Sequence, residues 1–573
     1  MKVVIIGGVA GGASCAARLR RLDETTEIIL LERGEHISYA NCGLPYHVGG
    51  VIQSRSALLL QTPEDMKRQF NIDVRVYNEA IAIDRKQKTV TVKRLQDGEI
   101  YHESYDVLVL STGSSPIRPP IPGIESERIQ TLWTVNDTDR IRALIRKQNI
   151  HNVAVIGGGF IGLEMAENLR HLGLNVSLIE MLNQVMAPMD YEMAQLLHEN
   201  ILQNGVKLHL NDGVSYFKEE NGQVFITLQS GNVVSAEMVI LSIGVRPNRE
   251  LAKTAGLKVN ARGGVLVDKH LRTSDPSIYA VGDVIEVNDF IFGEPTMVPL
   301  AGPANKQGRI AADNIAGGQE IYEATQGTSV VKVFDLTAAS TGANEKALQK
   351  RGLKRGTDYE SVTICQNSHA NYYPGATLMI LKLLFSMDGK KLFGAQIIGR
   401  EGVDKRIDTL AVTIRLGGGV KELTQLELAY APPYSSAKDP VNMLGFAAQN
   451  VLNGIVRFAP WNVAETEKNA IFLDVRENVE NTAYAIPGSV HIPLGSLREK
   501  LTSLDKKKPV VVFCAIGVRA YNAARILAQH GFSDVYVYPG GSHFYQSTHF
   551  DKEKLRSATV VAVADSGHVV DLD

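Results

Sequence analysis

The stretch Lys2-Val3-Val4-Ile5-Ile6-Gly7-Gly8-Val9-Ala10-Gly11-Gly12 opens the chain with a short β-branched run that breaks into glycines. A helical pattern follows from Ala13 to Leu22, and the next strand, 28–31, ends in Glu32. A strand, a glycine turn, a helix and a strand that ends in an acid predict a dinucleotide-binding unit, in which amides at the helix start bind pyrophosphate and the acid accepts ribose hydroxyls. The usual middle glycine of G-x-G-x-x-G is Val9, which is a departure from the motif.

A second unit of the same kind follows the first and has all three glycines. Strand 153–156 leads into Gly157-Gly158-Gly159-Phe160-Ile161-Gly162, a helix runs through Leu172, and strand 176–179 ends in Glu180. A carboxylate at this place accepts the 2′-hydroxyl of NAD and repels a 2′-phosphate. The sequence therefore predicts that NADH is preferred over NADPH.

A single thiol lies in Ser38-Tyr39-Ala40-Asn41-Cys42-Gly43-Leu44-Pro45-Tyr46, shortly after the first unit. Disulfide reductases with a C-x4-C pair would have a second cysteine at position 47, which is His47 here. A one-thiol site must find its second sulfur in the substrate. A buried structural cysteine is the alternative, but a thiol flanked by glycine and proline just after a nucleotide fold is poorly explained by packing.

Composition restricts the class of protein. A chain of 573 residues is long enough for three or four domains. With 60 basic and 62 acidic residues and no long run of either sign, no nucleic-acid or membrane partner is expected. Four scattered cysteines indicate a reducing compartment. The first strand begins at residue 2 and no apolar run reaches the length of a membrane span, so the protein is expected to be cytoplasmic.

Later segments return to the first nucleotide unit. The strand 106–110 ends in Ser111-Thr112-Gly113, and prolines between 116 and 122 mark a crossing between domains. The stretch 240–248 leads back, and the run 278–283 ends in Gly282-Asp283. A carboxylate there can accept a hydrogen bond from a ribityl hydroxyl.

These features together resemble the pyridine nucleotide-disulfide oxidoreductases over the first 450 residues or so, and the Cys42 loop resembles their single-cysteine branch, which holds coenzyme A-disulfide reductase, NADH oxidase and NADH peroxidase. The resemblance implies FAD in a discontinuous first fold, NADH in the inserted second one, and a homodimer whose dimerisation domain completes the partner subunit's active site. The implied cofactor-binding residues are Gly7, Gly8, Ala10, Gly11, Gly12, Glu32, Arg33, Thr112, Gly113, Gly157, Gly159, Gly162, Glu180, Gly244, Gly282, Asp283, Pro299, Leu300 and Ala301.

Two tyrosine-bearing loops, 370–375 and 429–440, fit the coenzyme A-disulfide reductase branch. The resemblance implies Tyr372 and Tyr430 as catalytic residues on the substrate side. It implies coenzyme A contacts at Ser14, Arg18, Arg21, Ser38, Asn41, Asn305 and Lys438. From the residues alone, tyrosines beside proline are more often loop packing, and an arginine pair on a helix is more often a solvated flank.

A separate small domain follows a connector that contains Pro460 and Trp461. The stretches 471–476, 486–493, 510–520 and 536–541 resemble, in this order, a single rhodanese domain. Cys514 lies at the end of a buried strand, on a loop that leads into a helix. Backbone amides in such a loop are turned towards the sulfur and stabilise a thiolate or a persulfide anion. The six-residue loop from Cys514 to Arg519 suits sulfur in that family, which implies both as catalytic residues. An inert cysteine at a strand end is the alternative.

The other two cysteines, Cys15 and Cys365, are predicted to be packing residues. No cluster of cysteine, histidine and acids has metal-ligand spacing, and no serine–histidine–acid set is suggested, so no metal is expected.

The predicted fold class is α/β with two Rossmann-like domains, an α+β dimerisation domain and an α/β rhodanese domain. The predicted boundaries are 1–113 and 250–322 for the FAD domain, 114–249 for the NAD domain, 323–446 for the dimerisation domain, 447–466 for a linker, 467–560 for the rhodanese domain and 561–573 for a tail.

The hypothesis for function is NADH-dependent, FAD-dependent reduction of coenzyme A persulfide or related polysulfides through Cys42, with Cys514 handling sulfane sulfur. Three alternatives stay open. They are coenzyme A-disulfide reduction with an auxiliary sulfurtransferase, an NADH oxidase or peroxidase that cycles Cys42 through a sulfenic acid, and a non-catalytic redox sensor. Two complete nucleotide sites argue against a sensor, which needs no turnover machinery.

Overall fold

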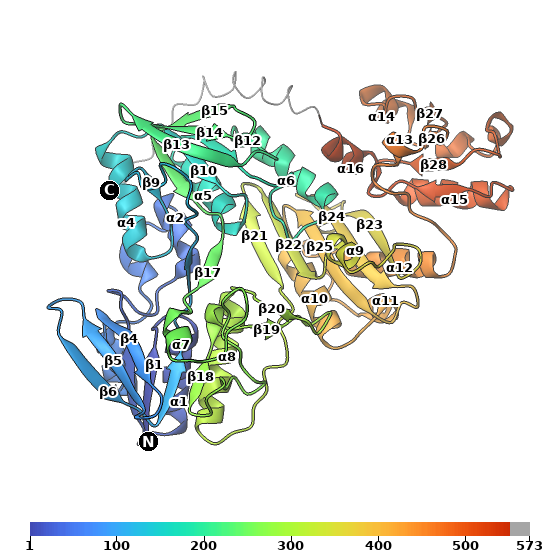
Figure 1. The fold of residues 1–573 in the computed structure, drawn as a ribbon. Coiled ribbons are helices and arrows are strands. Elements are labelled where there is room, and N and C mark those ends of the chain that lie inside the picture. The colour runs from blue at the N-terminus through green and yellow to red at the C-terminus, as the bar shows by residue number, and fades with distance from the viewer. Residues whose placement is uncertain (551–573) are drawn as a thin grey trace. The chain divides into compact units, whose positions relative to one another are not determined.

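A computed structural model describes residues 1–550, which form two compact units (Figure 1). Within the described residues, the first unit contains Met1–Asn183 and His209–Gly327, and the second contains Gln184–Leu208 and residues 328–550. Residues 551–560 of the predicted rhodanese domain and the predicted tail 561–573 lie outside the described residues.

The first unit contains a five-stranded parallel sheet whose strands come from distant parts of the chain. Its order is β18-β7-β1-β2-β3, and Ile6 pairs with both Leu31 and Leu110. The strands are β1 (Lys2–Ile6), β2 (Glu27–Leu31), β3 (Asp73–Arg75), β7 (Val107–Leu110) and β18 (Ile278–Ala280). Because β18 pairs with β7, residues after 250 complete a sheet that begins at residue 2.

Helices and a small sheet cover this parallel sheet. Helices α1 (Gly11–Leu22) and α8 (Ala301–Ile315) pack closely, since a Cβ on Gly308 would lie 2.3 Å from the carbonyl oxygen of Gly11. The other elements here are α3 (Pro63–Phe70), β4 (Asn78–Asp84), β5 (Thr89–Arg94), β6 (Ile100–Ser104), α7 (Glu250–Thr254), β19 (Val287–Asn288) and β20 (Pro295–Thr296). The core consists of aliphatic side chains such as Val3, Ile5 and Leu30.

A second sheet in this unit has the order β12-β11-β10-β16-β9. Its pairs β10–β11, β10–β16 and β16–β9 are parallel. The elements are β9 (Ile129–Gln130), α4 (Val135–Lys147), β10 (Asn152–Ile156), α5 (Phe160–His171), β11 (Asn175–Ile179), β12 (Lys207–His209), β13 (Val214–Glu220), β14 (Gln223–Leu228), β15 (Val233–Ala236) and β16 (Met238–Leu241). The crossings between the two sheets are β8 (Ser114–Pro116) and β17 (Val245–Pro247), which pair antiparallel.

The second unit contains a five-stranded antiparallel sheet of order β21-β22-β25-β24-β23. Helix α10 packs against β22 and β25, and α12 packs against β23 and β24. The elements are β21 (Ser329–Val333), β22 (Leu336–Gly342), α9 (Glu345–Lys350), β23 (Tyr359–Asn367), β24 (Leu378–Ser386), β25 (Leu392–Gly399), α10 (Val403–Arg415), α11 (Val420–Gln425) and α12 (Pro440–Leu452).

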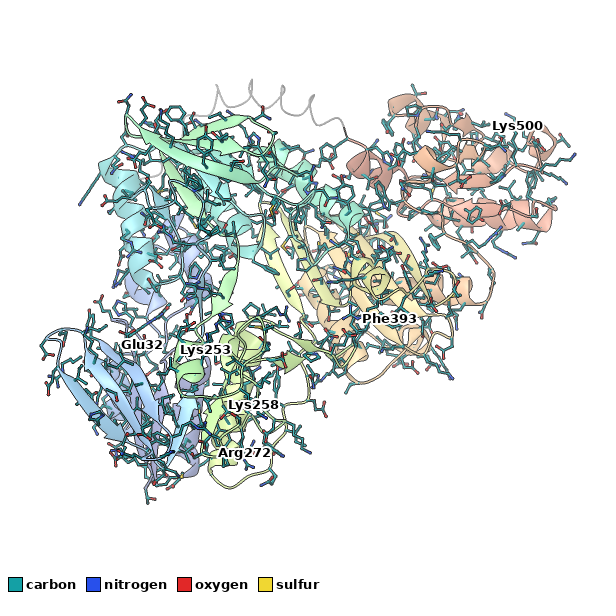
Figure 2. The ribbon with its side chains drawn as sticks, viewed as in Figure 1. Glu32, Lys253, Lys258, Arg272, Phe393 and Lys500 are labelled. Atoms are coloured by element: carbon teal, nitrogen blue, oxygen red, sulfur yellow. The ribbon has the colours of Figure 1, made fainter. Side chains whose placement is uncertain are left out.

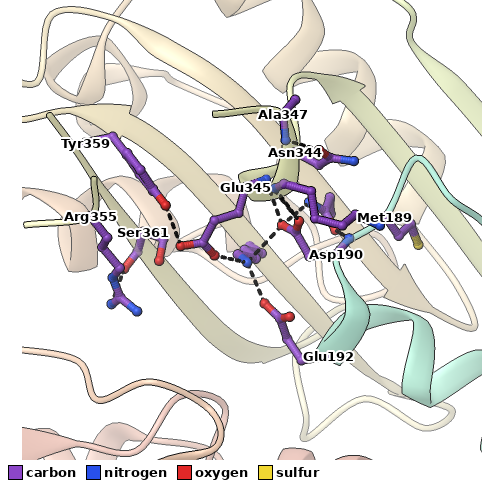
Figure 3. A network of polar contacts seen from close by, with 12 residues as sticks. Met189, Asp190, Glu192, Asn344, Glu345, Ala347, Arg355, Tyr359 and Ser361 are labelled. Atoms are coloured by element: carbon purple, nitrogen blue, oxygen red, sulfur yellow. Dashed lines mark hydrogen bonds and ion pairs between the residues drawn. The ribbon is translucent and has the colours of Figure 1, made fainter. Parts of the chain in front are cut away.

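A buried lysine explains why Gln184–Leu208, predicted as part of the NAD domain, groups with this sheet (Figure 3). Lys382 of β24 is 2 % exposed, and its ammonium lies 2.9 Å from Asp190, 2.5 Å from Glu192 and 2.7 Å from Glu345. Asp190 and Glu192 lie at the start of α6 (Tyr191–Gln203). The three acids bring their oxygens within 4.8 Å of one another, but the lysine already supplies the cation. The ion-pair network therefore attaches α6 to the sheet.

The remainder of the second unit holds a four-stranded parallel sheet of order β27-β26-β28-β29. Its elements are β26 (Ile471–Asp474), α14 (Asn478–Ala483), β27 (Val490–His491), β28 (Val510–Phe513), α15 (Val518–Gln529), β29 (Val535–Val537) and α16 (Gly541–Thr548). Within residues 1–550, no helix is both long enough and apolar enough to cross a bilayer.

The predicted linker 447–466 differs from an open tether. Helix α12 continues to Leu452, and Phe458 forms a bridge with Val537 beside β29. The amide of Ala459 donates to the carbonyl of Val537 at 3.0 Å, and Val456 belongs to the rhodanese-side core. Buried apolar side chains and an added backbone ladder hold this segment against the small sheet.

We expect Lys382→Met to lower the free energy of unfolding of the protein by about 3–5 kcal/mol, because it leaves buried carboxylates without their cation. Lowering the pH protonates carboxylates that have lost their partner, so the deficit should shrink as the pH falls. Urea denaturation measured at two pH values checks both expectations. Lys390→Met, at a side chain that is 85 % exposed, is the matched control and should change stability by less than about 0.5 kcal/mol.

Candidate active sites: two nucleotide cradles and two thiols

The first glycine turn brings the backbone of β1 close to the start of α1. Gly7 has a φ of +99°, and a Cβ there would lie 2.1 Å from the carbonyl oxygen of Ser111. A Cβ on Gly12 would lie 1.9 Å from the carbonyl oxygen of Gly7. Only glycine fits at both places, so the turn can pass close under the helix start. Val9 does not disturb this geometry, since Gly7 and Gly12 have the same roles as Gly157 and Gly162 of the second turn.

Glu32 closes this first cradle, at the end of the strand that follows α1 (Figure 2). Its carboxylate accepts from the amide of Gly8 at 2.9 Å and from the amide of Gly34 at 2.7 Å. The acid is thus held beside the glycine turn, where a ribose would need it. Arg33 follows it directly and is exposed.

The second cradle repeats this construction on β10 and α5. Gly157 has a φ of +106°, and a Cβ on Gly162 would lie 1.9 Å from its carbonyl oxygen. No described atom lies within 4 Å of the position of a Cβ on Gly159, so the middle of the turn is open. The carboxylate of Glu180 accepts from the amides of Gly158 at 2.7 Å and Leu182 at 2.8 Å.

Among the remaining predicted cofactor residues of the first unit, several follow β7 and β18 in the chain. Asp283 lies in the turn Gly282–Val284, accepts from Ser114 Oγ at 2.8 Å, and has a pKa raised by burial. Thr112 and Asn248 are joined by two hydrogen bonds of 2.9 and 2.7 Å. Positive φ angles occur at Gly113, Gly244 and Gly282. Leu300 caps the start of α8, with Pro299 before it and Ala301 after it.

These residues fit FAD and a pyridine nucleotide. No side chain of the described residues caps the first amides of α1 or α5, so those amides would be available to the oxygens of a bound pyrophosphate. Glu32 and Glu180 would hold ribose hydroxyls, and Asp283 would accept from the ribityl chain. When bound, these two cofactors supply two-electron redox chemistry.

The loop of Cys42 is attached to a neighbouring segment and to two helices. The amide of Ala40 donates to the carbonyl of Leu58 at 2.8 Å, and Tyr39 bridges Leu59. Cys42 is in the short turn η1 (Asn41–Gly43), its side chain is exposed, and α2 (Leu44–Val48) continues the chain. Helix α2 packs against α4 and α5. The Cys42 thiol is therefore accessible, and backbone hydrogen bonds and the packing of α2 hold its loop in place.

Glu164 of α5 is a site residue that the sequence analysis missed. Tyr46 Oη donates to Glu164 Oε1 at 3.4 Å. Burial, with the neighbouring Glu167, raises the pKa of Glu164 to about 7. Desolvation and Glu164 in turn raise the pKa of the Cys42 thiol. The sequence offered no signal for this contact, because it depends on how α2 packs on α5.

His47, at the position of the missing second cysteine, is buried against α4. Its Nδ1 lies 2.6 Å from the carbonyl oxygen of Ile52, and Arg142 Nη1 lies 3.0 and 2.9 Å from its two ring nitrogens. Burial, with Arg142 and Arg55 nearby, lowers the pKa of His47. The ring is held as a neutral structural group.

The predicted coenzyme A residues of the first unit lie on α1, α8 and the thiol loop. Arg18 pairs with Asp313 of α8 at 2.6 Å, and Ser14 Oγ donates to Asn305 Oδ1. The guanidinium of Arg21 lies 5.0 Å from the centre of the Phe70 ring. Ser38 has a φ of +45°, and Asn41 opens η1. Arg18 is thus already paired with a carboxylate, whereas Arg21 forms no ion pair with any residue of the described part of the chain and contacts the Phe70 ring.

The second unit brings the two predicted tyrosines together. The hydroxyl oxygens of Tyr372 and Tyr430 are 2.7 Å apart, although the residues are 58 positions apart in the chain. Both side chains are exposed, as is that of Lys438. Asp439 next to Lys438 is buried and accepts from Ser435 Oγ at 2.6 Å and from Arg406 at 3.1 Å. The tyrosine loop is anchored from below by these buried contacts.

Cys514 is at the end of β28 and is 1 % exposed. The amide of Gly517 donates to its Sγ at 3.1 Å, and its own carbonyl oxygen accepts from the amide of Ser542 at 2.7 Å. A Cβ on Gly541 would lie 2.6 Å from that carbonyl oxygen. Arg519 on α15 is paired with Glu480 of α14. The other thiols, Cys15 and Cys365, are buried, and burial raises the pKa of each to about 12.

Comparison with known families covers most of the chain. The model of the pyridine nucleotide-disulphide oxidoreductases matches residues 1–308, the model of the dimerisation domain of that family matches 328–440, and the model of the rhodanese-like domain matches 461–548. These matches confirm the predicted fold class.

Among curated relatives, the coenzyme A disulfide reductase of Staphylococcus epidermidis is 36 % identical over 449 residues, which cover 78 % of this chain and 100 % of the relative. Among solved structures, reduced Bacillus anthracis CoADR-RHD is 50 % identical with a TM-score of 0.92, covering 96 % of this chain and 98 % of that one. An NAD-dependent persulfide reductase from A. fulgidus is 37 % identical with a TM-score of 0.89, covering 95 % and 100 %. The chain therefore belongs to the pyridine nucleotide-disulphide oxidoreductase family, whose members use FAD and NAD(H), and it carries a rhodanese-like domain in its C-terminal part.

Proposed function

We propose that this oxidoreductase reduces the sulfur–sulfur bond of coenzyme A persulfide or a related persulfide with NADH, through Cys42. The observation that carries the proposal is a single accessible thiol on a supported loop, with His47 where a second cysteine would be. The second sulfur must then come from the substrate. The likeness to a persulfide reductase and the presence of a second sulfur-handling domain support this substrate class.

The chain's own residues account for the sulfur chemistry. The Cys42 thiolate attacks the substrate's S–S bond, and the departing thiolate takes up a proton. Cys42 is left as a persulfide or a mixed disulfide, which two electrons cleave to the free thiolate and a released thiol or hydrogen sulfide. Overall, a persulfide, NADH and one proton give a thiol, hydrogen sulfide and NAD⁺. We infer that Glu164, whose charge acts on the Cys42 thiol and which is hydrogen-bonded to Tyr46, takes or returns the proton.

Coenzyme A-disulfide reduction is the second candidate, and the name of the curated relatives favours it. Under that reading the rhodanese-like domain is an auxiliary sulfurtransferase. An NADH oxidase or peroxidase is a third candidate, since a water-forming NADH oxidase matches 79 % of this chain at 28 % identity. Anaerobic steady-state kinetics with NADH and, in turn, coenzyme A persulfide, coenzyme A disulfide, oxygen and peroxide separate the three.

A homodimer in the cytoplasm is part of the proposal. The exposed tyrosine pair Tyr372–Tyr430 and the neighbouring Lys438 would face coenzyme A bound at Arg21, Ser38 and Asn41 of the partner subunit, as the resemblance implies. The match of residues 328–440 to a dimerisation domain supports this arrangement.

Cys42→Ser should leave reduction of the flavin by NADH intact but lower persulfide and disulfide turnover by at least about a thousandfold, because serine cannot form the sulfur adduct. Stopped-flow flavin bleaching and steady-state NADH oxidation measure the two steps. Cys15→Ser, at a buried thiol outside the proposed chemistry, is the control. Sulfur turnover that survives in the Cys42 variant would exclude Cys42 from the mechanism.

The NADH preference follows from Glu180. A 2′-phosphate beside this carboxylate meets a like charge, and such contacts cost several kcal/mol, so we expect kcat/KM to be at least about a hundredfold higher for NADH than for NADPH. Glu180→Ala should narrow the ratio, whereas Glu250→Ala, at a side chain that is 76 % exposed, should not. A wild-type enzyme that prefers NADPH would contradict this role of Glu180.

Glu164→Gln should shift the ionisation of Cys42 to lower pH, because the carboxylate is one of the groups that raise the pKa of the thiol. The rate of Cys42 alkylation by iodoacetamide, measured against pH under nitrogen, reports this directly. Glu125→Gln, which removes a carboxylate that is 88 % exposed, should leave the profile in place. An unchanged profile in Glu164→Gln would mean that the carboxylate does not act on the thiol.

A further inference from the structure

The charges around Cys514 are compensated within the rhodanese-like domain. Arg476 and Asp474 form a buried pair, with Arg476 Nη2 2.6 Å from Asp474 Oδ2 and side chains that are 4 % and 0 % exposed. Asn481 also donates to this carboxylate at 3.0 Å. The positive charge of Arg476 is therefore neutralised by Asp474.

Arg519, at the end of the thiol loop, is compensated in the same way. Its two terminal nitrogens donate to the two oxygens of Glu480 at 2.6 and 2.7 Å. Arg519 holds the pKa of Glu480 down at about 2, so the acid stays ionised at any physiological pH. Glu480 and the Cys514 thiol both raise the pKa of Arg519, so the guanidinium interacts with both groups.

The Arg519–Glu480 pair is fixed in place at the start of α14. Glu480 Oε2 also accepts from the amide of Glu477 at 3.0 Å, which caps α14. A bidentate arginine–carboxylate contact has a fixed geometry. Glu480 thus balances the positive charge that Arg519 presents to an anion at Cys514.

Between Cys514 and Arg519, the loop has no positively charged side chain that would balance the charge of a dianionic donor. Ala515, Ile516, Gly517 and Val518 are uncharged, and Val518 is 49 % exposed. His543, whose amide donates to Ala515, has a pKa lowered by burial and by Arg476, which keeps its ring neutral. The helix-start amides remain, and they suit the single charge of a thiolate or persulfide.

We propose that Glu480 is a specificity-determining residue of this second thiol site, which cancels the charge of Arg519 and so reserves Cys514 for donors whose reacting sulfur group carries at most one negative charge. Dianionic donors such as thiosulfate are disfavoured. With a persulfide, the S–S bond breaks, Cys514 gains the sulfane sulfur, and the departing thiolate takes the proton that Cys514 gives up. With thiosulfate, the same step would release a sulfite dianion beside Glu480.

The test compares the full-length FAD-loaded wild type with Glu480→Gln under nitrogen. Each is mixed with thiosulfate or with the persulfide of N-acetylcysteamine, trapped with iodoacetamide, and assayed by peptide mass spectrometry for one added sulfur on Cys514. The two donors differ in intrinsic reactivity, so their rates are not compared with each other. For each donor, the rate of sulfur loading in the variant is compared with the rate in the wild type. We expect Glu480→Gln to raise the thiosulfate rate by at least about tenfold and the persulfide rate by less than about threefold. The gained thiosulfate rate should fall as ionic strength rises.

Glutamine keeps the oxygen that caps α14, so the variant should fold. Val518→Lys, which adds a cation at an exposed loop position, provides an independent variant and should also favour thiosulfate. Glu499→Gln, an exposed carboxylate of the same domain, is the charge-matched control and should change neither rate. An unchanged thiosulfate rate in both variants, or an equal gain with both donors, would overturn the proposal.

The inference rests on the proposed handling of sulfane sulfur by Cys514. The same experiment separates the two. If neither donor loads sulfur on Cys514 in any of the proteins, that part of the proposed function is wrong; if sulfur loads but Glu480→Gln and Val518→Lys do not change the donor preference, only the specificity inference is wrong.

Discussion

The close approach of backbone to backbone at two pairs of glycines is the constraint on which the first unit depends. Gly12 lies against the carbonyl of Gly7, and Gly162 against the carbonyl of Gly157, so that a single added Cβ would collide at either place. This contact seats each helix directly on its strand and leaves the first helix amides open. The two carboxylates at the ends of the following strands, Glu32 and Glu180, then lie beside those amides.

In the second unit, one set of ion pairs is buried and another is partly exposed. Lys382 is buried among three acids and attaches α6 to the antiparallel sheet. Arg519 and Glu480 form a partly exposed pair in the same domain as Cys514. Burying a charge is costly unless it is paired, so the first network has a structural consequence. The second pair involves Arg519 at the end of the Cys514 loop, where we propose that it selects the charge of the donor that can approach.

The surroundings of the two thiols have opposite effects on a negative charge at the sulfur. Cys42 is accessible, but Glu164 opposes its ionisation. Cys514 is buried, yet an amide of its loop donates to its sulfur at 3.1 Å. The first arrangement couples loss of the thiol proton to a nearby carboxyl group, and the second stabilises a sulfur anion with backbone dipoles.

The sequence by itself determined both nucleotide units, the thiol loop and the rhodanese-like motifs, because each is a local pattern of glycines, β-branched runs and terminal acids whose geometry follows from the backbone. Only the tertiary structure decided which residues surround the thiols. Glu164 reaches Tyr46 across 118 positions, and Glu480 reaches Arg519 across 39. The ordering of the segment between Leu452 and Val463 likewise follows from its ladder with Val537. Such contacts depend on how helices and strands pack, and no periodicity or spacing in the chain encodes them.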